Sequence, residues 1–122
     1  MTHPGAAVPG IDVTETAARL DAGGPEAPLL LDVREPRELQ GARVEGAVHL
    51  PISVFQQRYT ELPQDRQILV MCASGNRSAA VTAFLLRNGW TDVHNVEGGI
   101  SAWRRSGFAV KSGPIEPGEG RL

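Results

Sequence analysis

The residue best suited to chemistry in this chain is its only cysteine, Cys72. An apolar run typical of a buried strand precedes it at residues 67–71. The segment Ala-Ser-Gly-Asn-Arg-Ser (residues 73–78) follows and leads into an expected helix. A tight loop of this kind aims backbone N–H groups inward, and the helix adds the positive end of its dipole. Such a nest binds anions, so it lowers the pKa of a thiol and supplies a thiolate nucleophile.

A lone cysteine at the end of an apolar strand is more often a small buried hydrophobe than a reactive group. The residues after Cys72 favour the reactive interpretation here. Gly75 lets the loop turn without steric cost, and Arg77 brings a cation to it. We therefore expect Cys72 to be the catalytic residue. We expect the substrate to be bound by the loop residues Ala73, Ser74, Gly75, Asn76, Arg77 and Ser78.

Short apolar runs alternate with helical stretches along the chain. Strands are expected at residues 11–13, 29–31, 46–50, 67–71 and 92–96. Helices are expected at residues 14–22, 37–40, 53–62, 78–88 and 100–106, with Thr14 and Ser53 as candidate caps. Alternation of this kind implies crossover connections between parallel strands. The predicted fold class is α/β, with about five mainly parallel strands and helices on both faces; the strand order stays open.

The 122 residues fit a single domain. Residues 1–10 hold two prolines and two glycines, and residues 113–122 hold two prolines and three glycines with little that could pack. Both segments are typical of flexible tails. We expect the folded domain to span residues 11–112.

Charge and composition limit the partners. The formal net charge of −2 argues against binding to nucleic acid or to an anionic membrane surface. No apolar run approaches the length of a membrane helix, and no secretory segment is visible. One cysteine excludes an internal disulfide and a Cys-rich metal site, so we expect no bound metal. A cytoplasmic location follows as an expectation, since a lone thiol fits a reducing compartment.

Four stretches of the chain resemble the signatures of the rhodanese family of sulfurtransferases, in the family's order. The stretch Val-Met-Cys-Ala-Ser-Gly-Asn-Arg-Ser at residues 70–78 resembles the family's active-site loop. The others are Leu-Leu-Asp-Val-Arg-Glu-Pro (30–36), Gly-Ala-Val-His-Leu-Pro (46–51) and Asn-Val-Glu-Gly-Gly-Ile-Ser-Ala-Trp (95–103). One departure is visible outside the loop, where Ala-Arg-Val at residues 42–44 replaces the Gly-His-Ile of many members.

The resemblance implies a sulfur transfer in two steps. The Cys72 thiolate would take the outer sulfur of a donor such as thiosulfate as a persulfide, and an acceptor, cyanide or a thiol, would then remove it. Backbone donors of residues 73–78 would hold the negative charge, and no metal or organic cofactor would be needed. With one cysteine there is no resolving thiol in the chain, so the sulfur must pass to another molecule.

Two other functions stay open. In the first, the domain is a sulfur-relay module that accepts persulfide sulfur from a protein partner. In the second, it is a phosphatase or an arsenate reductase. Related phosphatases resemble Cys-x5-Arg, a loop of seven residues, whereas Cys72 to Arg77 makes a loop of six. The shorter loop favours a sulfur atom over a tetrahedral phosphate.

Asp32 and Arg34 follow the strand at residues 29–31 and should lie on the same sheet edge as Cys72. In a functional interpretation, Arg34 shapes the rim of the pocket, while Asp32 or Glu35 pairs with an arginine behind the loop. In a structural one, they form an ion pair that ties the loop to the sheet. Three histidines (His3, in the N-terminal tail, His49 and His94) do not form a Cys–His pair by sequence, and the loop can activate Cys72 without one.

Overall fold

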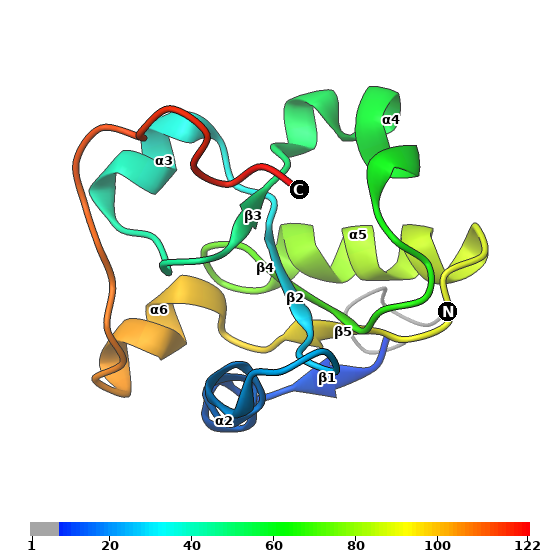
Figure 1. Ribbon diagram of the computed structural model, residues 1–122, viewed down its shortest axis with the longest axis horizontal. Coiled ribbons are helices and arrows are strands. Elements are labelled where there is room, and N and C mark those ends of the chain that lie inside the picture. The colour runs from blue at the N-terminus through cyan, green and yellow to red at the C-terminus, as the bar shows by residue number, and fades with distance from the viewer. Residues whose placement is uncertain (1–7) are drawn as a thin grey trace.

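Five parallel strands form one sheet in the computed structural model, which describes residues 8–122 (Figure 1). They are β1 (Gly10–Ile11), β2 (Leu29–Asp32), β3 (Val48–His49), β4 (Ile68–Met71) and β5 (Val93–Val96). The order across the sheet is β1-β5-β4-β2-β3, so β4 is the central strand. The prediction of an α/β fold with five mainly parallel strands is confirmed, and the strand order that it left open is now defined.

Both faces of the central strands are buried, because their side chains are apolar at every position apart from Asp32 at the end of β2. Alternate residues of β4 enter two separate cores. Ile68 and Val70 belong to the core under α4 and α5, whereas Leu69 and Met71 pack toward α2 and α6. Helices therefore cover both faces, and the carboxyl end of β4 is held at the centre of the molecule.

The helical elements are α2 (Val13–Ala22), α3 (Pro36–Gly41), η1 (Ile52–Val54), α4 (Phe55–Arg58), η2 (Tyr59–Glu61), α5 (Asn76–Arg87) and α6 (Gly99–Arg105). The longest, α5, has 12 residues. Among the described residues, no helix combines the length and the apolar character needed to cross a membrane.

Two helix predictions need correction. Asp12, not Thr14, caps α2, because the backbone of Asp12 is extended and its carboxylate accepts a hydrogen bond from the N–H of Glu15. The single helix expected at residues 53–62 is divided into η1, α4 and η2. Ser53 does not cap it, since its N–H and hydroxyl both donate to the Glu35 carboxylate.

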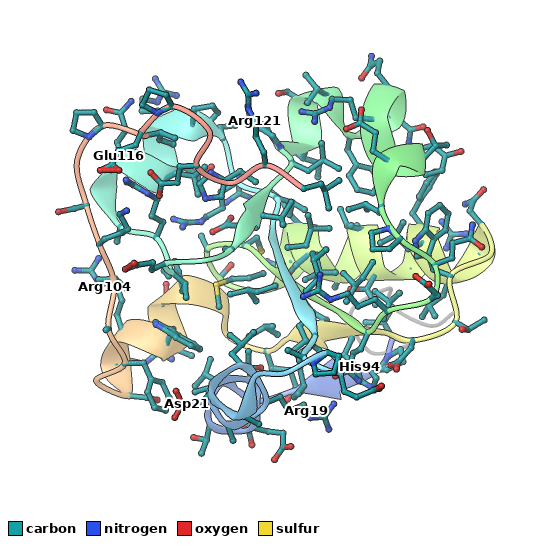
Figure 2. All side chains as sticks on the ribbon, in the orientation of Figure 1. Arg19, Asp21, His94, Arg104, Glu116 and Arg121 are labelled. Carbon is teal, nitrogen blue, oxygen red and sulfur yellow. The ribbon has the colours of Figure 1, made fainter. Side chains whose placement is uncertain are left out.

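The C-terminal segment, residues 113–122, packs against the domain, although the sequence predicted a flexible tail. It runs beside α3 toward β3 (Figure 1), and Figure 2 labels Glu116 and Arg121 along it. The N–H of Gly113 donates to the carbonyl of Gln40 in α3, and the N–H of His49 in β3 donates to the carbonyl of Gly120. The N-terminal segment predicted as flexible, residues 1–10, lies mostly outside the described residues, and Gly10 belongs to β1.

Arg43 explains why this segment is held. Its side chain is only 1% exposed and forms an ion pair with Glu119. It also donates to three carbonyl groups, those of Leu39, Gly113 and Pro114. Composition alone predicted a flexible tail. The residue that binds the carbonyl groups of Gly113 and Pro114 is Arg43, which lies 70 residues or more away, so the local sequence gave no sign of this contact.

Replacing Arg43 by alanine should destabilise the domain by on the order of 2–4 kcal/mol, because the three carbonyls and Glu119 lose their donor. Urea unfolding measures the loss, and limited proteolysis should show faster cleavage within residues 113–122. The matched control is Arg58→Ala, since the ion pair between Arg58 and Glu61 is exposed on both sides and its loss should leave the midpoint unchanged. Equal midpoints for Arg43→Ala and the wild type would contradict this role.

Candidate functional site

Cys72 lies directly after β4, and the loop that follows turns at Gly75 into α5. The φ angle of Gly75 is 108°, a conformation that favours glycine. The Cys72 sulfur accepts hydrogen bonds from the N–H of Gly75 at 3.1 Å, from the N–H of Ser78 at 3.4 Å and from the Ser78 hydroxyl at 3.3 Å. The residue is 1% exposed. The loop that the sequence predicted is therefore wrapped around the thiol.

Two opposing effects set the acidity of this thiol. Burial raises the pKa of Cys72, because it disfavours the charged form. Hydrogen bonds from the Ser78 hydroxyl and from the N–H groups of Ser78, Gly75 and Ser74 lower the pKa, and together they outweigh burial. The thiol pKa is consequently below its ordinary value, and the start of α5 adds the positive end of a helix dipole.

The start of α6 supports the loop from the other side. The N–H of Ile100 donates to the carbonyl of Cys72 at 2.9 Å, and the N–H of Ser101 donates to that of Ala73 at 3.1 Å. This close approach requires a glycine at position 99, because a Cβ there would collide with both carbonyl groups. Gly98 and Gly99 thus provide both a turn and close packing beside the site.

Arg34 and Asp32 form a buried ion pair with each other. The Nε and Nη2 atoms of Arg34 donate to the Asp32 carboxylate, the latter at 2.8 Å, and Nη2 also donates to the carbonyl of Ala42. Both side chains are almost fully buried. The ion pair of the structural interpretation is therefore present, but its other side-chain hydrogen bonds reach only Glu38 and Ala42 and not the Cys72 loop that it was expected to tie to the sheet.

Arg77 pairs with Glu38 of α3, a carboxylate to which the sequence gave no role. Its two Nη atoms donate to the two carboxylate oxygens at 2.7 and 2.8 Å. This hydrogen bonding lowers the pKa of Glu38 to about 2 and raises that of Arg77. The pair joins the Cys72 loop to α3, so the loop is fixed by its side chains as well as by its backbone.

The other predicted residues divide between the loop surface and distant parts of the fold. Ser74 and Asn76 are exposed, whereas Gly75 and Ser78 are buried. His49 lies beside Gly120 at the opposite sheet edge from β1, and burial lowers its pKa. His3 lies outside the described residues. No group of three or more metal-ligating side chains occurs within residues 8–122.

Sequence reasoning gave no role to Asn95, which lies in β5 within one of the four resembling stretches. Its amide Nδ2 donates to the carbonyl of Gly75 at 3.3 Å, and its Oδ1 accepts from the Ser78 hydroxyl. Asn95 is only 6% exposed. A buried polar residue inside a strand was the available signal, since such a group needs partners.

Known proteins resemble this chain both in fold and in sequence. A family model, the rhodanese-like domain, matches residues 12–106. A sulfurtransferase from Allochromatium vinosum is 38% identical over 82 residues, which cover 67% of this chain and 77% of that protein. The crystal structure of a rhodanese-related protein from Thermoplasma volcanium matches with a TM-score of 0.76 at 34% identity, covering 84% of this chain and 97% of that one. The chain therefore belongs to the rhodanese-like domain family.

A larger enzyme contains a similar domain. A thiosulfate sulfurtransferase from Pseudomonas aeruginosa matches with a TM-score of 0.76 at 29% identity. The match covers 87% of this chain but only 20% of that one. Together with the Allochromatium relative, this places the chain in a family of the sulfurtransferase type.

The Glu38–Arg77 ion pair should make the stability of the domain depend on pH in the acidic range. Glu38 titrates near its ordinary value in the unfolded chain but at about 2 in the folded one, so its contribution is present above about pH 4.5. It is lost as the pH falls toward about 2. Glu38→Gln should lower the urea midpoint at about pH 7, and this difference from the wild type should shrink at about pH 3. The control is Glu61→Gln, which removes one partner of the exposed ion pair with Arg58. A midpoint difference for Glu38→Gln that does not change with pH, or an equal difference for Glu61→Gln, would contradict the assignment.

Proposed function

We propose that this domain is a sulfurtransferase that carries sulfane sulfur on Cys72 as a persulfide. The observation that carries the proposal is the Cys72 sulfur, held by two backbone N–H groups and a hydroxyl at the carboxyl end of the central strand. Ligands of parallel α/β sheets bind outside this end of the strands. The lowered pKa of the thiol supplies the thiolate that such chemistry requires.

In the proposed reaction, the Cys72 thiolate attacks the outer sulfur of a donor such as thiosulfate. A new S–S bond forms, the old one breaks, and its electron pair leaves with sulfite. Cyanide or a thiolate then attacks the outer sulfur, and the electron pair of the second broken bond restores the Cys72 thiolate. The donor oxidises the Cys72 sulfur in the first step and the acceptor reduces it in the second, so the full cycle leaves the protein unchanged and needs no metal or organic cofactor.

The loop suits this reaction because the charge stays near it throughout. The negative charge moves from the Cys72 sulfur to the outer sulfur, a shift of one bond length. The N–H groups of Gly75 and Ser78 already face the Cys72 sulfur at the start of α5, and the loop would stabilise the charge on either sulfur without rearrangement. Ser74 and Asn76, exposed on the loop, would meet the donor or the acceptor.

Intact-mass measurement after incubation with thiosulfate tests the proposal. The wild type should gain one sulfur atom, lose it again on addition of cyanide, and release thiocyanate in equal amount. Cys72→Ser should do none of these, because the serine hydroxyl is not ionised at neutral pH. Thr16→Val is the matched control, since it removes a buried hydroxyl from α2 that donates to the backbone carbonyl of Asp12 and takes no part in the Cys72 loop. A wild type that gains no sulfur, or a Cys72→Ser protein that gains it, would refute the proposal.

The second candidate is a relay module that takes its sulfur from a persulfide on a partner protein. The observation that favours it is the pairing of both arginines near the loop, Arg34 with Asp32 and Arg77 with Glu38. Thiosulfate carries two negative charges, and these paired guanidinium groups offer it little net attraction. A cysteine persulfide carries at most one, so it depends less on a cation at the site.

Competing donors distinguish the two candidates. A relay module should be loaded faster by a persulfide-bearing cysteine desulfurase than by thiosulfate at equal concentration. Glu38→Gln frees the charge of Arg77, and it should raise the rate of loading by thiosulfate severalfold while changing the rate with the protein donor much less. Faster loading of the wild type by thiosulfate, or an equal effect of Glu38→Gln on both donors, would exclude the relay function.

A further inference from the structure

The Ser78 hydroxyl lies between two acceptors. Its Oγ is 3.3 Å from the Cys72 sulfur and 2.5 Å from the Oδ1 atom of Asn95. A serine hydroxyl has a single hydrogen, so it donates to one of the two at a time. Ser78 is fully buried. Bulk water does not reach this hydroxyl, so no water molecule from solvent replaces it as the donor to the acceptor that it leaves.

The orientation of the Asn95 amide is set by its other contact. Its Nδ2 faces the carbonyl of Gly75, which also accepts from the N–H of Ala79 at 3.1 Å. The reverse orientation would bring two oxygen atoms together at Gly75, so Oδ1 faces Ser78. Asn95 thus presents an acceptor, and not a donor, to the hydroxyl beside the sulfur.

We propose that Asn95 is a positioning residue of the Cys72 site, because it competes with the Cys72 sulfur for the single hydrogen of the Ser78 hydroxyl. This inference rests on the proposed function of Cys72 as the sulfur carrier and adds control over its charged state. Asn95 does not touch the sulfur, since its side-chain hydrogen bonds reach Gly75 and Ser78, and the role proposed for it runs through Ser78.

The competition has a different outcome in each state of the sulfur. In the thiol, Ser78 donates to Asn95, and a lone pair of its oxygen faces the S–H group. In the thiolate, the hydroxyl turns to the charged sulfur and leaves Oδ1 of Asn95 without this donor, which is unfavourable in a buried site. In the persulfide, the charge has moved to the outer sulfur, so the hydroxyl can return to Asn95. Asn95 therefore favours the loaded protein over the free thiolate.

Charged groups around the site come from several elements. They are Asp32 at the end of β2 with Arg34 just after it, the pair of Glu38 and Arg77 between α3 and α5, and Glu97 after β5. No hydrogen bond or ion pair of the described structure joins any of them to Ser78 or Asn95. Neutral substitutions at positions 78 and 95 leave all of these charges in place.

A double-mutant cycle on the pKa of Cys72 tests the inference, with the rate of alkylation by iodoacetamide measured against pH. Asn95→Leu removes the competing acceptor, so the pKa should fall by about half a unit or more, roughly a threefold change in the thiolate-to-thiol ratio. Ser78→Ala should raise the pKa. In the Ser78→Ala protein, Asn95→Leu should cause no further shift, because the contested hydrogen is absent.

A shift that persists in the Ser78→Ala protein would assign Asn95 a merely structural role in holding Gly75, and it would overturn the inference. So would an unchanged or raised pKa in Asn95→Leu. Asn95→Val, whose side chain suits a buried strand, replaces Asn95→Leu if that protein does not fold. Thr16→Val again serves as the control and should leave the pKa unchanged.

The readout does not use sulfur transfer, so the two proposals can fail separately. Intact mass after incubation with thiosulfate or the protein donor is measured on the same four proteins. If the wild type loads sulfur but the cycle shows no coupling, the positioning role of Asn95 is refuted and the transfer function stands. If the coupling is present but neither donor loads the wild type, Asn95 still positions the Ser78 hydroxyl and the transfer function fails.

Discussion

The site depends on one constraint: a sulfur atom must sit at the end of a buried central strand and still hold a negative charge. Burial at this place opposes the charge, and only hydrogen-bond donors built into the loop reverse that effect. The Ser78 hydroxyl and the backbone of residues 73–78 supply them, because this backbone turns at Gly75 and starts α5 immediately. The glycine at position 99 lets α6 press its own N–H groups against the same loop. Much of the architecture around β4 thus serves to hold a short stretch of backbone in one shape.

Two ion pairs hold the surroundings of the loop and leave little net charge there. Arg34 is bound to Asp32 under the surface, and Arg77 is bound to Glu38 beside the loop. Charge stabilisation at the sulfur therefore comes from dipoles, those of the Ser78 hydroxyl, of peptide N–H groups and of a helix start, and not from a free cation. Dipoles of this kind are short in range, so they act on an atom bound at Cys72 far more than on a charged molecule approaching from solvent.

The parts of this fold that could be predicted are those encoded locally. The loop around Cys72 is contiguous in the sequence, and its glycine, its small residues and the following helix define the nest without any distant partner. Glu38, Asn95 and Glu119 could not be assigned in this way, because their partners are 39, 17 and 76 residues away. Those contacts follow from the order of strands in the sheet, and alternation of strands and helices does not determine that order. The same gap explains why residues 113–122 seemed unable to pack.

The contact between the N–H of His49 and the carbonyl of Gly120 occurs at an outer strand of the sheet. Outer strands present unpaired peptide groups to which another chain can add, a recognised route to aggregation. Residues 113–122 occupy that position in β3, with Arg43 as their anchor. Arg43 therefore also helps to shield this outer strand from pairing with another chain.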